Sequence, residues 1–285
     1  MTKDEIMGTT AVLHSFPARK APHATYMPEN CPHRAGHASA TCQTCGLREL
    51  CLPAGLELQE IDQLNAIINR KRPLKRGEYL YRTGGTLPSI YAVRTGFLKS
   101  CVLHDDGREQ VAGFHMMGEL LGLDAIGSGM HMCDAVALED SEVCEIPFND
   151  LERLGREIPA LQQHFHRIMS RELTQDQRHL LSLGTMRAEE RLAAFLLSLS
   201  QRLAARGYLN NEFDLRMSRV DIGSYLGIQI ETVSRMLSRF AESGLIQIKQ
   251  RHIKLIDMNG LYELAGIPNP DRTTCVSADI PVKQA

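Results

Sequence analysis

Two short helices joined by a tight turn are predicted by the sequence Met217-Ser-Arg-Val-Asp-Ile-Gly-Ser-Tyr-Leu-Gly-Ile-Gln-Ile-Glu-Thr-Val-Ser-Arg-Met-Leu-Ser-Arg-Phe-Ala-Glu-Ser-Gly244. Ser218 is followed three residues later by Asp221, a capping box that predicts the start of the first helix. The turn is expected at Gly227, and Gly244 stands where a helix end favours a residue free to adopt positive φ. The pattern is that of a helix-turn-helix.

The second helix, read from Gln229 to Ser243, has an apolar face and a polar face. Apolar residues recur at i, i+3, i+4 and i+7, the spacing of a buried face; they are Val233, Met236, Leu237 and Phe240. The polar face consists of Glu231, Ser234, Arg235 and Ser238. An arginine can bond guanine O6 and N7 together, and a carboxylate can accept from cytosine N4. Because a carboxylate facing phosphates is unfavourable unless it bonds a base edge, Glu231 favours sequence reading on DNA over the alternative, a helical hairpin with a solvated face.

The composition limits the class of protein. The chain has 285 residues and a net charge of −2. The chain as a whole is therefore not a polycation that would bind DNA through its net charge. Residues 216–255 nevertheless carry seven Lys/Arg against three Asp/Glu, which fits one DNA-facing module in a regulator. No apolar run is long enough to span a bilayer, and no signal peptide is recognised, so we expect a cytoplasmic protein. In that compartment its eight cysteines are expected to be thiols or metal ligands.

Three cysteines lie close together in a Cys-x2-Cys-x5-Cys run formed by Cys42, Cys45 and Cys51. Such spacing can grip one metal centre, but three thiolates complete neither a four-iron cluster nor a tetrahedral zinc site. A distant fourth ligand is therefore needed; the alternatives are a redox dithiol or chance. The leader of residues 1–40 is expected to be mobile, and its Cys31 and scattered histidines are either a further metal site or incidental.

Residues 56–155 predict a helix followed by a small β sandwich or jelly roll. The helix is expected over residues 56–70, with a buried face of Leu58, Ile61, Leu64 and Ile68. Glycines then punctuate short β-type runs at residues 79–82, 90–94, 97–103, 110–115, 134–138 and 142–146. Three cysteines are placed in these strands, and the residues alone do not select the fourth ligand among them: Cys101, Cys133 and Cys144.

A long helix is predicted after Pro159 and is expected to end at Gly184. Five of its residues are spaced 4, 3, 4 and 3 apart, a heptad seam suited to pairing with a second copy; they are Met169, Leu173, Asp176, Leu180 and Leu183. Asp176 is the one carboxylate among these five residues. It either faces the second copy across the seam or lies at the edge of the seam, where it is solvated. Another helix starts at Ala188, and after the helix-turn-helix, residues 245–256 predict a hairpin wing whose Lys249, Arg251 and Lys254 can reach DNA phosphates.

The order of these features resembles the cyclic-AMP receptor protein superfamily, and most closely its oxygen-sensing branch, the fumarate and nitrate reductase regulator (FNR). The resemblance covers residues 42 to about 260. It is carried by the cysteine run and by four further segments: Gly113-Phe-His115, Glu142-Val-Cys-Glu-Ile-Pro-Phe148, Ala188-Glu-Glu-Arg-Leu-Ala-Ala-Phe195 and Glu231-Thr-Val-Ser-Arg235.

The resemblance implies an α+β chain with five parts: a disordered leader (1–40), a cluster-binding segment and jelly-roll sensor (41–155), a dimerisation helix (156–185), a winged helix-turn-helix (186–267) and a disordered tail (268–285). It implies a [4Fe–4S] cluster on Cys42, Cys45, Cys51 and Cys144, and a homodimer that binds a TTGAT-type palindrome until oxygen degrades the cluster to a [2Fe–2S] form. Base reading is implied for Glu231, Ser234 and Arg235. An aspartate at the position of Asp176 is implied to weaken the dimer by repulsion.

Two departures qualify the resemblance. Met132 and Cys133 stand where cyclic-AMP-binding relatives have an Arg-Ser pair, so no cyclic nucleotide is expected. Arg108 stands where related activators often carry an acidic residue, which puts the expected contact with RNA polymerase in doubt. We expect a regulator and no enzyme. The competing hypotheses are an electron carrier or redox enzyme with an iron–sulfur cluster, and a haem- or nitric-oxide-sensing regulator of the same fold.

Overall fold

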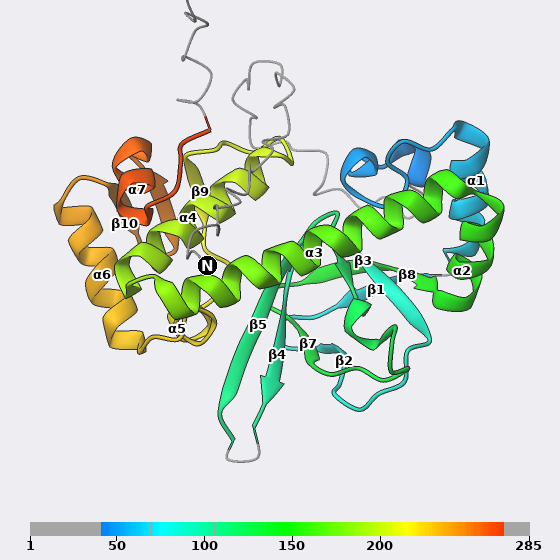
Figure 1. Ribbon diagram of the computed structural model, residues 1–285, viewed down its shortest axis with the longest axis horizontal. Helices are drawn as coiled ribbons and strands as arrows, with labels where there is room; N and C mark the ends of the chain where they lie inside the picture. The colour runs from blue at the N-terminus through cyan, green and yellow to red at the C-terminus, as the bar shows by residue number, and fades with distance from the viewer. Residues whose placement is uncertain (1–40, 69, 105–106, 271–285) are drawn as a thin grey trace, which may run out of the picture.

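The computed structural model describes residues 41–68, 70–104 and 107–270 (Figure 1). The expected mobile leader, with Cys31, lies outside the described residues, and so does the expected tail of residues 268–285 from residue 271 onward, which includes Cys275. None of the helices within the described ranges has the length and apolar character needed to cross a membrane.

The N-terminal half is two antiparallel sheets packed face to face, preceded by short helices. The sheets have the orders β1-β8-β3-β6 and β2-β7-β4-β5, and buried side chains from both of them, such as Tyr91 and Leu98, form the core between them. This confirms the predicted β sandwich. The elements are η2 (Cys42–Thr44), η3 (Arg48–Leu50), α1 (Leu58–Ile67), β1 (Arg70–Leu74), β2 (Tyr79–Tyr81), β3 (Ser89–Thr95), β4 (Phe97–Leu103), β5 (Glu109–Met116), β6 (Leu120–Leu121), η4 (Leu123–Ala125), β7 (Asp134–Ala137), β8 (Ser141–Pro147) and α2 (Phe148–Glu157).

The C-terminal half is a helical domain with a small sheet of order β10-β11-β9. Its elements are α4 (Ala188–Ala204), β9 (Glu212–Asp214), α5 (Arg219–Leu226), α6 (Ile230–Glu242), β10 (Ile246–Lys249), β11 (His252–Leu255) and α7 (Met258–Ala265). The predicted capping box is present, since the Ser218 hydroxyl accepts from the backbone N–H of Asp221. Gly227 and Gly244 both have positive φ, as predicted. These findings confirm the helix-turn-helix and its wing.

Helix α3 (Pro159–Thr185) connects the two halves. It begins with proline at its first position, where the missing N–H breaks no helical hydrogen bond. Its 27 residues give it a length of about 40 Å. In Figure 1 it runs from α1 and α2 at one end of the molecule to α5 at the other. One rigid element therefore extends from the cysteine segment to the helix-turn-helix.

Several local predictions were wrong. Leu58 is 62% exposed, because it is the first residue of α1 and precedes the part of the helix that reaches the core. Gly184 does not end α3, which continues to Thr185, and Gly184 is not among the glycines with positive φ. Cys133 lies just before β7 and not in a strand. Strands β1, β6 and β9 and helices α2 and α7 were not predicted.

Ion pairs join the domains at several places. Glu119, after β5, forms 2.6 Å ion pairs with Arg202 and Arg206 of α4. Lys99 of β4 lies 2.8 Å from Asp221 at the start of α5, and both side chains are nearly buried. Burial alone would raise the pKa of Glu119, but the two guanidinium groups outweigh it and hold this pKa below its ordinary range. The carboxylate thus stabilises the domain arrangement.

We predict that Glu119→Gln costs about 3 kcal/mol of unfolding free energy, because it leaves two nearly buried guanidinium groups without their carboxylate. The lowered pKa of Glu119 means that its contribution is present above the ordinary glutamate pKa and is lost as the pH falls through the lower folded value. Urea unfolding at neutral and acid pH measures both effects. Glu139→Gln is the control, since its ion pair with Arg216 also joins the domains but is more exposed and should cost below about 1 kcal/mol. Equal losses in the two variants would contradict the prediction.

Candidate metal centre and nucleic-acid interface

The structure brings Cys42, Cys45, Cys51 and Cys144 to a single pocket. The first three come from the segment of short turns around η2 and η3, and Cys144 comes from the middle of β8. Apart from Arg48 and Arg94, the residues that line this pocket are apolar or cysteine. Among the three later cysteines that the sequence left open, Cys144 is therefore the one that lies with the run.

Local hydrogen bonds wind the cysteine segment into consecutive tight turns. Within it, the Cys51 N–H donates to the Leu47 carbonyl at 3.1 Å. The Cys42 N–H donates to the side-chain oxygen of Asn65 in α1, also at 3.1 Å, which anchors the start of the segment. Leu50 packs against Gly118, where an added Cβ would approach the Leu50 Cβ to 3.0 Å. The segment is thus held by α1 on one side and by the turn after β5 on another.

The four thiols interact electrostatically. Burial, followed by the neighbouring Cys144 and Cys45, raises the pKa of Cys42 to about 12. Burial is also the main cause that raises the pKa of Cys51 and of Cys144. Four thiolates would repel one another in this apolar pocket, so the donor set suits a centre that carries compensating positive charge.

The other cysteines of the β roll lie elsewhere. Cys101 is buried within β4, and Cys133 lies 3.6 Å from Asp124; neither lines the pocket of the four cysteines. No group of three or more His, Cys, Asp or Glu side chains in the described part of the chain is placed to hold a metal ion. In a four-iron cluster each cysteine binds a different iron, so its ligands are farther apart than those of one ion. The donor set fits a cluster better than a single ion.

The predicted polar face of α6 is exposed along its length. Glu231, Ser234, Arg235 and Ser238 are exposed, whereas Val233, Met236, Leu237 and Phe240 are buried. Arg235 makes one weak contact, at 3.3 Å, with the Thr232 hydroxyl. A feature that the sequence reading missed is Gly223 of α5, where an added Cβ would lie 2.6 Å from the carbonyl oxygen of Ile228. The signal for it was a glycine inside a helix four residues before the turn.

The wing places basic side chains beside this face. Lys249 and Arg251 are exposed around the tight turn between β10 and β11, where Gln250 has a φ of 59°. Lys254 is half-buried and lies 3.5 Å from Glu212, so its charge is partly compensated. Lys249 and Arg251 are better placed than Lys254 to meet a phosphate backbone.

The predicted seam lies on a partly exposed side of α3. Leu173 is 60% exposed and Leu180 is 67% exposed, with exposed Asp176 between them; Met169 and Leu183 are half-buried. Partial desolvation raises the pKa of Asp176. Leu181, outside the predicted seam, is 64% exposed as well, so α3 carries three exposed leucines.

Comparisons with known proteins place these features in context. The family model of the CRP-like helix-turn-helix domain matches residues 190–264, and that of the cyclic nucleotide-binding domain matches residues 71–157. The chain is 47% identical to the transcriptional regulatory protein btr of Bordetella pertussis, over 80% of this chain and 94% of that protein. It is 46% identical to the fumarate and nitrate reduction regulatory protein of Escherichia coli, over 82% and 93% of the two chains. Among solved structures, FixK2 from Bradyrhizobium japonicum matches with a TM-score of 0.64 and 32% identity, over 68% of this chain and 96% of that one.

Proposed function

The chain belongs to the CRP/FNR family of transcription regulators, in the branch of the fumarate and nitrate reduction regulators, and we propose that it senses oxygen through a [4Fe–4S] cluster. The observation that supports the cluster is the apolar pocket shared by Cys42, Cys45, Cys51 and Cys144. These residues would hold it, one cysteine to each iron.

The protein's own groups are suited to keep such a centre dry and electrically balanced. Leucine, isoleucine and valine side chains line the pocket and limit the access of water to the four cysteines, which are partly buried. Arg94 and Lys71 are near enough to lower the pKa of both Cys42 and Cys144, so they favour the thiolate form that binds iron. A cluster held by these four cysteines would supply the sensitivity to oxygen, through its conversion to a [2Fe–2S] form.

We propose that α3 pairs with α3 of a second copy through the seam of Met169, Leu173, Asp176, Leu180 and Leu183, and that the homodimer reads a TTGAT-type palindrome. Glu231, Ser234, Arg235 and Ser238 would face base edges, while Lys249 would contact phosphate. Domain limits at residues 41–155, 156–185 and 186–267, a cytoplasmic location, activation through RNA polymerase and independence from cyclic nucleotides belong to the same proposal.

Replacing Arg235 by alanine should reduce operator affinity by about 1–3 kcal/mol per half-site, because its guanidinium is exposed at the position expected to bond guanine twice. The loss should be smaller on an operator already changed at that base. Lys249→Ala should instead weaken binding equally on both operators and reduce its salt dependence. Binding titrations of both variants on both operators, at two salt concentrations, distinguish base reading from phosphate contact. Equal losses for Arg235→Ala on both operators would rule out base reading by this side chain.

The proposed function is tested by operator binding with and without oxygen. Protein purified anaerobically should bind a TTGAT palindrome at least about 1,000-fold more tightly than a scrambled duplex, the lower end of the usual range of specific over non-specific binding. Brief exposure to air should remove this preference. Binding that does not change in air would contradict oxygen sensing. A visible spectrum typical of haem would favour the haem-sensing alternative.

A further inference from the structure

His164 is a buried side chain of α3 for which the proposed function has no role. It is 6% exposed and lies on the same side of the helix as Leu161 and Ile168, which are three residues before it and four after it. Leu161 and Ile168 belong to a hydrophobic core that also contains Leu52 and, at its edge, Cys51. One core therefore packs the cysteine segment directly against the dimerisation helix.

Within this core, His164 makes a specific polar contact with the cysteine segment. Its Nε2 lies 3.0 Å from the backbone carbonyl oxygen of Cys51. A carbonyl oxygen can only accept, so His164 donates this hydrogen bond through the N–H at Nε2.

The peptide groups around Cys51 are held at several points. The Cys51 carbonyl also accepts from the Ala54 N–H at 3.1 Å, and the Cys51 N–H donates to the Leu47 carbonyl. The next side chain, Leu52, is 1% exposed. A change that shifts the Cys51 backbone therefore acts directly on a group that α3 contacts.

We propose that His164 is the positioning residue through which the ligand state of Cys51 sets the position of α3. This inference rests on the proposed cluster function. When Cys51 is fixed as a ligand, its carbonyl is fixed too and holds α3 through His164. Without that constraint only the neighbouring backbone hydrogen bonds restrain the carbonyl, and its bond to His164 weakens. A difference of this kind between two states is what couples a site to an equilibrium elsewhere.

The geometry of α3 can carry this coupling to the seam. Leu173 is nine residues after His164, a distance of about 14 Å along a helix. Because a helix is stiff over this length, a displacement at His164 is passed on to Leu173 and Asp176 with little loss. Leu173, Asp176 and Leu180 of the seam are exposed, so they are free to meet a second copy.

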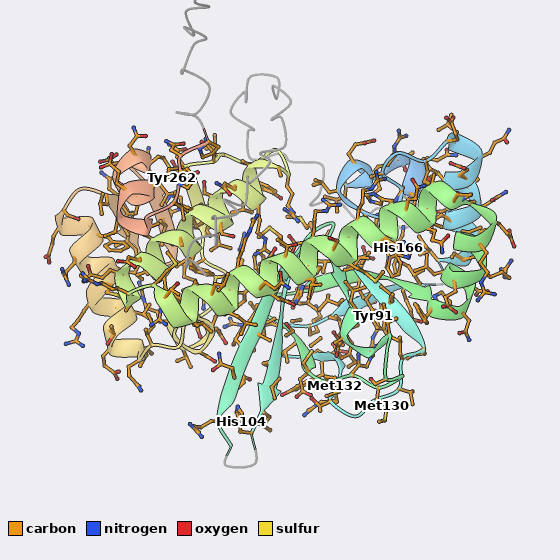
Figure 2. The ribbon with its side chains drawn as sticks, viewed as in Figure 1. Tyr91, His104, Met130, Met132, His166 and Tyr262 are labelled. Carbon is orange, nitrogen blue, oxygen red and sulfur yellow. The ribbon has the colours of Figure 1, made fainter. Side chains whose placement is uncertain are left out.

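Three variants separate coupling from packing. His164→Leu fills the space but has no donor. His164→Gln restores an N–H donor, because the glutamine Nε2 is as many bonds from the backbone as the histidine Nε2. His166→Leu is the matched control, since His166 lies two residues later on α3 and is exposed (Figure 2).

The experiment measures iron content and the dimer dissociation constant of each cluster-loaded protein by anaerobic sedimentation. His164→Leu should bind as much iron as the parent but dimerise about tenfold more weakly, the effect expected from two lost hydrogen bonds per dimer. His164→Gln should recover most of the affinity, and His166→Leu should match the parent. In cluster-loaded protein, amide hydrogen exchange over residues 51–54 should be faster in His164→Leu than in His166→Leu, and in cluster-free protein the two variants should differ less.

Each other outcome counts against the inference. A loaded His164→Leu protein that dimerises like the parent would overturn it. A His164→Leu protein that takes up no iron would overturn it as well, because the bond would then maintain the site without transmitting its state. If the parent itself binds no iron and sulfide, the proposed function fails first, and the inference fails with it.

Discussion

Replacing Cys144 by serine is expected to abolish iron and sulfide binding, from about four of each per chain to nearly none. Serine has almost the same shape as cysteine, but its hydroxyl remains protonated at neutral pH and does not replace a thiolate ligand. The loss should be as complete as for serine at Cys42, Cys45 or Cys51, because all four line one pocket. Anaerobic promoter control should disappear with the cluster. Iron and sulfide analysis of protein purified without oxygen gives the answer.

The control is Cys133→Ser. Cys133 lies outside the pocket of the four cysteines and is only partly buried, so this variant should keep full iron content. Cys101→Ser should keep it too, at some cost in stability, because Cys101 is buried inside β4. Full iron in Cys144→Ser together with loss of iron in Cys101→Ser would show that the fourth ligand is wrongly assigned.

Replacing Asp176 by leucine is expected to produce dimer and operator binding in air, without a cluster. Asp176 lies between the exposed Leu173 and Leu180, so in a symmetric pair two carboxylates would approach each other and lose hydration. Leucine removes this repulsion and adds apolar burial of about 1.5–3 kcal/mol per side chain. With two copies per dimer, the dissociation constant should fall at least ~100-fold. Sedimentation of the aerobic cluster-free protein measures it.

Two further variants separate charge from apolar burial. Asp176→Asn removes only the charge and should give a smaller gain than leucine. Gln175→Leu adds the same apolar side chain at an exposed neighbouring position outside the seam and should stay as monomeric as the parent. If Asp176→Leu also stays monomeric, repulsion at this residue does not control the dimer, and cluster loading must act elsewhere.

Local signals were sufficient to predict the helix-turn-helix. The cap at Ser218 and the turn at Gly227 depend on neighbouring residues, so their spacing in the sequence determines their structure. Strand β1 could not be predicted in the same way. Its residues Arg-Lys-Arg-Pro-Leu begin with three basic side chains and include proline, and they form a strand because β8 pairs with them. Tertiary pairing outweighed local preference there.

The candidate site was only partly predictable from the residues. The run of Cys42, Cys45 and Cys51 was visible as spacing, but residue-level reasoning did not distinguish Cys144 from Cys101 and Cys133, because sheet packing brings it to the run from far along the chain. The resemblance to the family selected it, and the structure places it in the same pocket. The contacts between domains were not predicted at all, since each depends on how folded parts meet.

The central claim is that oxygen acts on the cysteine site and thereby on pairing through α3. It is tested most directly by sedimentation velocity of anaerobically purified protein, followed both in the visible absorption of the cluster and in the absorption of the protein, before and after a measured dose of oxygen. We predict that the visible absorption sediments with a dimer. Oxygen should remove this absorption and leave a monomer. Visible absorption that sediments with a monomer before oxygen is added would contradict this claim. So would a dimer that persists after the visible absorption is lost.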